Sequence, residues 1–203
     1  VGMAVIGQTA HITPADKKLY ALRDVTATVD NFGLIASSIM SKKLAAGSDA
    51  IVLDVKCGDG AFMEDLDDAI TLAELMVKIG KAAGRRTVAA ITEMGQPLGK
   101  AVGNSLEVIE AIETLKGRGP ADITELAEKL GGIMVYLGGK AESPDEGMKL
   151  AAQALKDGRG LDKLREFIAA QGGNPDVTED YSLFPQHSMQ RELKADTDGY
   201  VEK

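Results

Sequence analysis

The sequence has 203 residues, of which 44% are hydrophobic and 27% are charged, and it contains no Trp. This balance is that of an ordinary globular chain, with room for one large domain or for one domain and part of another. The formal net charge of −8 argues against nucleic acid or an anionic membrane as the main partner. No apolar run approaches the roughly 18 residues that span a bilayer. One cysteine, Cys57, cannot form an internal disulfide, so a reducing, cytoplasmic location is expected.

Both ends of the sequence suggest a piece of a longer protein. Residues 1–8 form a short apolar run without an initiating Met and predict a buried strand that begins abruptly. Residues 191–195 and 200–202 are predicted to be strands of a region that has just begun. We therefore expect the fold to be truncated at both ends.

Two helices are predicted after the first run. Thr13 followed by Pro14 is typical of a helix start, with a hydroxyl N-cap and proline at the first helical position. Threonines and valine at 26–29 are poor helix formers and predict a break. Asp30 or Asn31 then caps a second helix that ends near residue 46.

The next segments indicate an α/β fold. Residues 49–56 and 86–92 are rich in Ile, Val and Thr and predict two buried parallel strands. Between them, residues 65–83 have helical periodicity and end at Gly84. A strand–helix–strand order predicts a mostly parallel sheet with crossover helices. Four more helices are predicted after the second strand. They are a helix capped by Asn104 or Ser105 that ends near residue 115, one over 122–136 with an interruption at Gly131 and Gly132, one over 144–156 capped by Ser143, and one over 162–171.

One stretch, residues 19–43, mixes polar and apolar residues in a way that packing alone does not explain. On a helix, Ser38 and Lys42 are four residues apart and share one face, and Arg23 can fold back toward them. A guanidinium, a hydroxyl and an ammonium beside apolar neighbours predict a site for a planar, oxygen-rich ligand. A solvated arginine and lysine with a locally capping serine explains the spacing equally well.

Three sequence blocks in a fixed order resemble one enzyme family. They are LYALRDVTATVDNFGLIASSIMSKK at 19–43, LDVKCGDGAFM at 53–63 and QPLGKAVGN at 96–104. In order and separation they closely resemble pyrimidine-nucleoside phosphorylases and thymidine phosphorylases. The resemblance covers essentially all of this sequence but only the middle of that family's chain. It implies a glycosyltransferase of nucleoside salvage, in which phosphate attacks a pyrimidine nucleoside and releases the free base and a pentose 1-phosphate.

The resemblance also implies the residues that hold the base. The donors that match those hydrogen-bonding the pyrimidine ring are Arg23, Ser38 and Lys42. Packing alone would place three further residues in the core, but the resemblance makes them apolar contacts to the base: Val29, Ile35 and Phe62. Fixed donors aimed at the ring would stabilise the negative charge that builds on the departing base.

A cation site is implied by the same resemblance. Leu98, Ala101 and Glu110 match two carbonyl ligands and one carboxylate ligand, and oxygen ligands suit K⁺ or Ca²⁺. The alternative is a loop packed on a helix with Glu110 in solvent. Phosphate is expected as co-substrate, but the family's phosphate-binding segments precede the part that this sequence matches.

No residue of this chain is predicted to be catalytic, because no nucleophile–base arrangement is evident. His11 and His187 are expected at the surface. Asp59 and Glu64 replace a serine and a lysine that the family usually has. Both replacements add negative charge and argue against phosphate binding by this glycine-containing loop.

By resemblance, residues 1–13 and 47–178 form the α/β domain, residues 14–46 part of a small all-α lobe, and residues 179–203 the start of a β-rich region. The parent protein is expected to be a homodimer, and the isolated chain to be inactive. One alternative is an inactive structural fragment. Another is a transferase like anthranilate phosphoribosyltransferase, against which the first sequence block argues.

Overall fold

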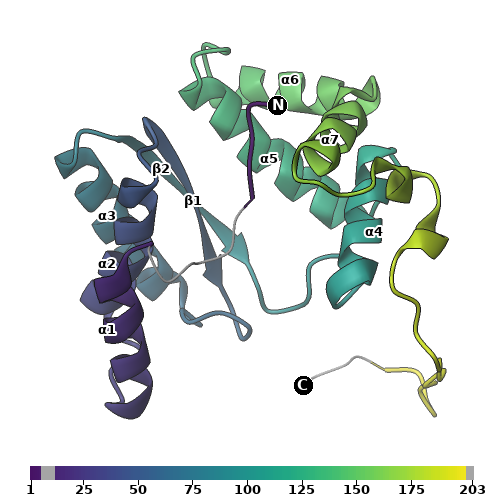
Figure 1. The fold of residues 1–203 in the computed structure, drawn as a ribbon. Coiled ribbons are helices and arrows are strands. Elements are labelled where there is room, and N and C mark those ends of the chain that lie inside the picture. The colour runs from purple at the N-terminus through teal and green to yellow at the C-terminus, as the bar shows by residue number, and fades with distance from the viewer. Residues whose placement is uncertain (6–11, 200–203) are drawn as a thin grey trace.

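The fold is built on two parallel strands joined by a crossover helix (Figure 1). The structure is a computed structural model that describes residues 1–5 and 12–199. Strands β1 (Ala50–Cys57) and β2 (Arg86–Glu93) pair in parallel along their full length, and α3 (Leu66–Ala82) connects them. Both strands and the crossover helix lie where the sequence predicts them. The described part of the chain is therefore α/β, as expected.

Helices cover both faces of this small sheet. Figure 1 shows α2 (Phe32–Ala45) and α3 on one side and α5 (Ala121–Leu137) on the other. Alternate β1 residues are buried in the core against α2 and α3, because successive side chains of a strand point to opposite faces. The buried core residues on this side are Ile35, Ala36, Met40, Ile51, Leu53, Val55, Met63, Ala69, Leu72, Ala73 and Met76.

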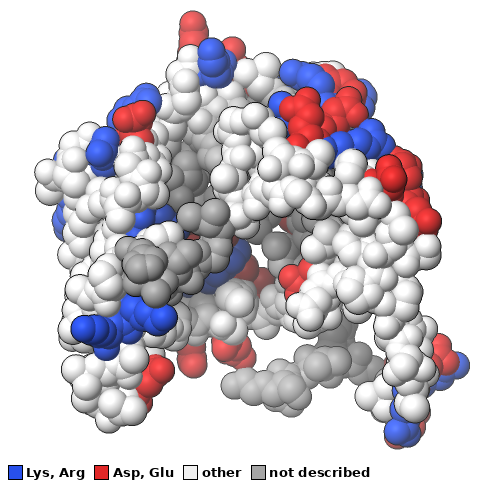
Figure 2. Space-filling view, in the orientation of Figure 1, with Lys and Arg blue, Asp and Glu red and all other residues white. Residues whose placement is uncertain are grey.

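The remaining helices flank these layers. Helix α1 lies beside α2, and α4, α6 and α7 lie beyond α5 (Figure 1). No helix of the described residues is long and apolar enough to cross a membrane. On the face drawn in Figure 2, acidic and basic side chains are intermingled over the upper right, where α7 carries several exposed ion pairs. The bounds are α1 Pro14–Val25, α4 Asn104–Leu115, α6 Pro144–Lys156, α7 Arg159–Ala170, and two short 3-10 helices, η1 Pro175–Thr178 and η2 Tyr181–Leu183.

Several predicted helix ends are confirmed by their hydrogen bonds. The Asn31 side chain accepts from the Leu34 N–H at 3.0 Å and caps α2. The Ser143 hydroxyl accepts from the Glu146 N–H at 3.2 Å and caps α6. Gly84 lies just after the C-cap of α3 and has φ +74°, a backbone conformation that residues other than glycine rarely adopt.

Two predicted N-caps are wrong. Thr13 has a left-handed backbone (φ 47°), makes no capping bond, and leaves its buried hydroxyl without a partner among the described residues. Gly103, rather than Asn104 or Ser105, precedes α4, with φ +100°. In both cases the chain enters the helix through a positive φ. A cap side chain that bonds the first turn normally sits on extended backbone instead.

The described ends of the chain are not strands. Residues 1–5 and 191–195 are irregular and exposed, because no neighbouring strand is present there among the described residues to satisfy their backbone groups. Instead, the Gln171 side chain bonds the N–H and the carbonyl of Val5, each at 3.1 Å. The predicted strand residues 6–8 and 200–202, and His11, lie outside the described residues.

The predicted interruption of α5 at Gly131 and Gly132 is wrong, because α5 is continuous through both. The glycines serve helix packing instead. A Cβ on Gly132 would lie 2.5 Å from the backbone nitrogen of Met148 in α6. A Cβ on Gly147 would overlap the carbonyl oxygen of Gly132. The absence of side chains at both positions therefore sets how closely α5 and α6 approach.

A polar network holds the segment after α7 against α4. The Lys116 ammonium donates to the carbonyl of Thr178, and the Tyr181 hydroxyl donates to Glu113. Arg118 donates twice to Glu113, at 2.6 and 2.8 Å. Hydrogen bonds from Arg118 and then Tyr181 lower the pKa of Glu113 to about 2. Burial and the bond to Glu113 raise the pKa of Tyr181 to about 12, so the phenol stays a donor.

We predict that Gly132→Ala or Gly147→Ala destabilises the chain by about 1–3 kcal/mol, because either methyl group forces α5 and α6 apart. Gly131→Ala is the matched control, since its Cβ would lie 3.5 Å from that of Ala151, an ordinary contact. Helix propensity makes this control neutral or slightly stabilising. Chemical denaturation of the three variants checks the prediction, and equal stabilities would contradict it.

We also predict a specific acid sensitivity at Glu113. A carboxylate whose folded-state pKa is depressed stabilises the fold above its ordinary pKa of 4.5, and this contribution is lost as pH falls toward about 2. Denaturation of Glu113→Gln and of the wild type should therefore give a difference in stability that is constant above about pH 5 and vanishes by about pH 2. The exposed Glu64→Gln variant is the control, and a pH-independent difference for Glu113→Gln would contradict the prediction.

Candidate functional site

Helix α1 buries two of its five charged residues and exposes its large apolar ones. Its buried side chains are Asp16 and Arg23, which are 8% and 6% exposed. By contrast, Leu19, Leu22 and Val25 are 56%, 54% and 79% exposed. Burying charge costs free energy unless each charge finds a partner. The inner face of α1 is therefore specialised for something other than core packing.

The partners of Asp16 come from the polar side of α2. The Lys42 ammonium lies 2.7 Å from Asp16 Oδ2 and 2.9 Å from the Ser38 hydroxyl oxygen. Ser38 also donates its hydroxyl proton to Asp16. Burial alone raises the pKa of Asp16, but the hydrogen bonds from Lys42 and Ser38 and the charges of Lys42 and Arg23 outweigh it and lower the pKa. The carboxylate is therefore ionised near neutral pH.

Arg23 lies next to this cluster but is bound to the turn between α1 and α2. Its guanidinium donates to the carbonyl of Thr28 at 3.4 Å and to the carbonyl of Val29. It also packs over the Tyr20 ring, 5.3 Å from the ring centre. A guanidinium has five N–H groups, so these bonds leave donors for other partners. Arg23 thus stabilises the turn as well as the charge cluster.

An apolar cavity of about 380 Å³ lies between α2, β1, α3 and the loop after β1, and Arg23, Ser38 and Lys42 are not among its lining residues. Two of the predicted apolar contacts, Ile35 and Phe62, line it, and Phe62 is 60% exposed although it is aromatic. Along α2, Ile35 and Ile39 line the cavity, and Ser38 and Lys42 follow at helical spacing on the same side. Val29 is half-buried and does not line this cavity.

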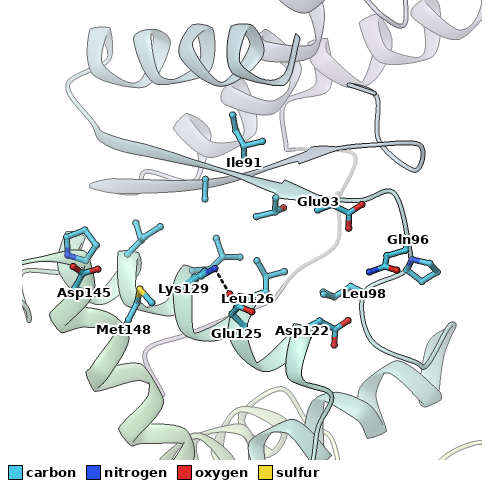
Figure 3. Close-up of a pocket in the computed structure, with 16 residues that line it drawn as sticks. Ile91, Glu93, Gln96, Leu98, Asp122, Glu125, Leu126, Lys129, Asp145 and Met148 are labelled. Atoms are coloured by element: carbon cyan, nitrogen blue, oxygen red, sulfur yellow. Dashed lines mark hydrogen bonds and ion pairs between the residues drawn. The ribbon is translucent and has the colours of Figure 1, made fainter. Parts of the chain in front are cut away.

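A second, wider cavity of about 630 Å³ lies between the sheet and helices α5 and α6 (Figure 3). It contains the exposed ion pair between Glu125 and Lys129, and Leu98 lies at one end. None of the predicted base-binding residues lines it. Volume alone would select this cavity, but the buried charges that distinguish a specialised site lie at the α1–α2 cluster.

The predicted cation ligands lie close together in the structure. The Glu110 carboxylate accepts the backbone N–H of Lys100 at 2.9 Å and that of Ala101 at 3.2 Å, and Leu98 is in the same loop. One carboxylate and two carbonyl groups fit a hard cation in kind, but they supply fewer than the roughly six to eight oxygens that Ca²⁺ takes. Among the described residues, no group of three or more His, Cys, Asp or Glu side chains could hold a metal ion.

Other candidate groups add little to the site. His187 is exposed, as predicted, and Cys57 is a half-buried free thiol. On the sheet, Lys56 pairs with Asp54 at 2.8 Å and donates to Thr92 at 3.0 Å, which explains these charges without a ligand.

Residues 1–161 match the model of the glycosyl transferase family, a/b domain. This chain belongs to that family.

Curated relatives within the glycosyl transferase family are similar over nearly the whole chain. A protein named pyrimidine-nucleoside phosphorylase from Geobacillus stearothermophilus is 59% identical over 199 residues, which is 98% of this chain and 46% of that protein. Proteins of the same name from Staphylococcus epidermidis and Staphylococcus aureus are 56% identical over the same shares. The chain therefore spans less than half the length of the curated relatives that it matches.

Asp16 is not among the site residues that the sequence predicts. The signal that could have found it is spacing. Asp16 and Arg23 are seven residues apart, which is two helical turns, so they share one face of α1. The apolar Leu22, six residues after Asp16, lies off that face. A charged stripe on the inner side of a helix requires charged or hydroxyl partners on the helix packed against it.

Proposed function

We propose that this chain supplies the base-binding half of a pyrimidine-nucleoside phosphorylase, a pentosyltransferase that converts a pyrimidine nucleoside and phosphate into the free base and a pentose 1-phosphate. The supporting observation is that α2 carries both the Ser38–Lys42 pair and Ile35, which lines an apolar cavity together with Phe62. The names of the relatives point to the same reaction. The proposed base donors are Arg23, Ser38 and Lys42, with Val29, Ile35 and Phe62 as apolar contacts.

The chemistry explains why an ammonium belongs there. When the bond between the sugar and the base breaks, the electron pair stays with the base, and negative charge spreads over its ring nitrogen and carbonyl oxygens. A protonated lysine held near those oxygens stabilises this charge more in the transition state than in the ground state. Lys42 is 32% exposed, so its head can reach a ligand while Asp16 and Ser38 hold it.

Further parts of the proposal concern the surroundings of the site. Leu98, Ala101 and Glu110 would contribute to a K⁺ or Ca²⁺ site completed by oxygens from elsewhere. Residues 14–46 would form part of an all-α lobe, distinct from the α/β domain. The exposed apolar side chains of α1 support a homodimer or a further contact with the same protein. A cytoplasmic role in nucleoside salvage would agree with the single free cysteine.

The function is tested by phosphate-dependent release of uracil from uridine and of thymine from thymidine. The assay uses a protein of the relatives' length that contains this sequence, in parallel with the 203-residue chain. We expect turnover by the longer protein that requires phosphate, and none by the 203-residue chain. No turnover by the longer protein would contradict the proposed function. Turnover by the short chain would contradict its assignment to half of the site.

Within the longer protein, Lys42→Gln should lower kcat/KM on the order of 10²–10³-fold, as for the loss of one donor to a developing anion. Glutamine keeps a hydrogen-bonding side chain beside the buried Asp16 but loses the charge. Lys43→Gln, at the exposed neighbouring position, is the matched control and should remain near wild type. Equal rates for the two variants would refute the role of Lys42. The comparison of Lys42→Gln with Lys43→Gln is easier to interpret than Arg23→Ala, because Arg23→Ala would also leave two carbonyl groups of the turn without their hydrogen-bond donor.

A further inference from the structure

Asp16 is a buried charged residue to which the proposed function assigns no role. It is 8% exposed, on a helix whose apolar residues face outward. The proposed function needs Arg23, Ser38 and Lys42, and it would be served by a lysine without an acidic neighbour. A carboxylate beside an ammonium even weakens the attraction of that ammonium for an anion. Its presence therefore suggests a role other than adding charge to the site.

Asp16 contacts two neighbours, Lys42 and Ser38, that differ in their hydrogen-bonding capacity. An ammonium has three N–H donors and accepts nothing, whereas an ionised carboxylate only accepts. Lys42 gives one N–H to Asp16 and one to Ser38, and its third has no partner among the described residues. Ser38 accepts from Lys42 and gives its only proton to Asp16, which leaves one lone pair on the hydroxyl oxygen.

We propose that Asp16 is a positioning residue that fixes the polarity of the base site, with Lys42 presented as a donor and Ser38 as an acceptor. This inference rests on the proposed function and adds the basis of base selection. Without the carboxylate, the Ser38 hydroxyl can rotate and donate to the ligand. The Lys42 head then also loses one of the two contacts that orient it. Asp16 acts through these two residues and needs no contact with the substrate.

This polarity matches one kind of pyrimidine. Uracil and thymine present a carbonyl oxygen next to a ring N–H, an acceptor beside a donor. Cytosine presents an amino group next to an unprotonated ring nitrogen, a donor beside an acceptor. A donor from Lys42 and a lone pair from Ser38 complement the first edge and oppose the second at both positions. A site that fixes its hydrogen-bond polarity discriminates strongly against the wrong partner, because buried groups are then left unpaired.

The test compares Asp16→Asn with Asp24→Asn in the longer protein that contains this sequence. Asp24 is an exposed carboxylate on the same helix, so its variant carries the same change of charge. The readouts are kcat and KM for uridine and the inhibition constants of uracil and cytosine. The amide introduced by Asp16→Asn can donate an N–H to Ser38 and free or reverse the hydroxyl. We expect the preference for uracil over cytosine to fall at least about tenfold in Asp16→Asn, with a raised KM, and to stay at the wild-type value in Asp24→Asn.

Ser38→Ala is the second variant. It is a small substitution, and it tests whether the Ser38 hydroxyl accepts a hydrogen bond from the base even if Asp16→Asn does not fold. It removes the acceptor, so the preference for uracil should fall similarly. An unchanged preference in a folded Asp16→Asn or in Ser38→Ala overturns the inference while leaving the proposed function intact. If the wild type releases no base from uridine, the proposed function fails first, and the inference fails with it.

Discussion

The ion pair between Asp16 and Lys42 is the interaction on which the candidate site depends. It joins residues that are 26 apart in sequence and fixes α1 against α2 through charge rather than through apolar contact. The pair is partly buried, so removing one member would leave an uncompensated charge, which is more costly than removing both. Its geometry also sets the Ser38 hydroxyl. One electrostatic contact therefore determines the helix orientation and the arrangement of the proposed ligand donors.

This ion pair explains why α1 turns apolar residues outward and charged residues inward. A helix packed on a core normally turns its apolar residues inward, yet Leu19 and Leu22 point outward here while Asp16 and Arg23 point inward. Such an arrangement sacrifices apolar burial for a preorganised polar site, which is the usual compromise of a functional region. The α/β layers behind it contain the main hydrophobic core and hold α2 in place.

Much of the fold was predictable because its signals are local. The β-branched runs of β1 and β2, the periodicity of α3, and the caps Asn31 and Ser143 are all set by neighbouring residues. The shared face of Ser38 and Lys42 followed from helical spacing. By contrast, the role of Gly132 depends on its contact with α6, and the role of Asp16 depends on α2. No local pattern shows which distant segment will pack there, so both were misread. The irregular ends were misread for the same reason, since a strand exists only where another strand pairs with it.

The central claim is that the α1–α2 cluster holds a pyrimidine base in the orientation that Asp16 fixes. A crystal structure of the longer protein with uracil bound tests this most directly. The account predicts that a uracil carbonyl oxygen lies within hydrogen-bond distance of Lys42 Nζ and that the ring N–H points to Ser38. Lys42 should still be paired with Asp16, and the ring should lie in the cavity lined by Ile35 and Phe62. Uracil bound instead between β2 and α5, or a Lys42 released from Asp16, would contradict it.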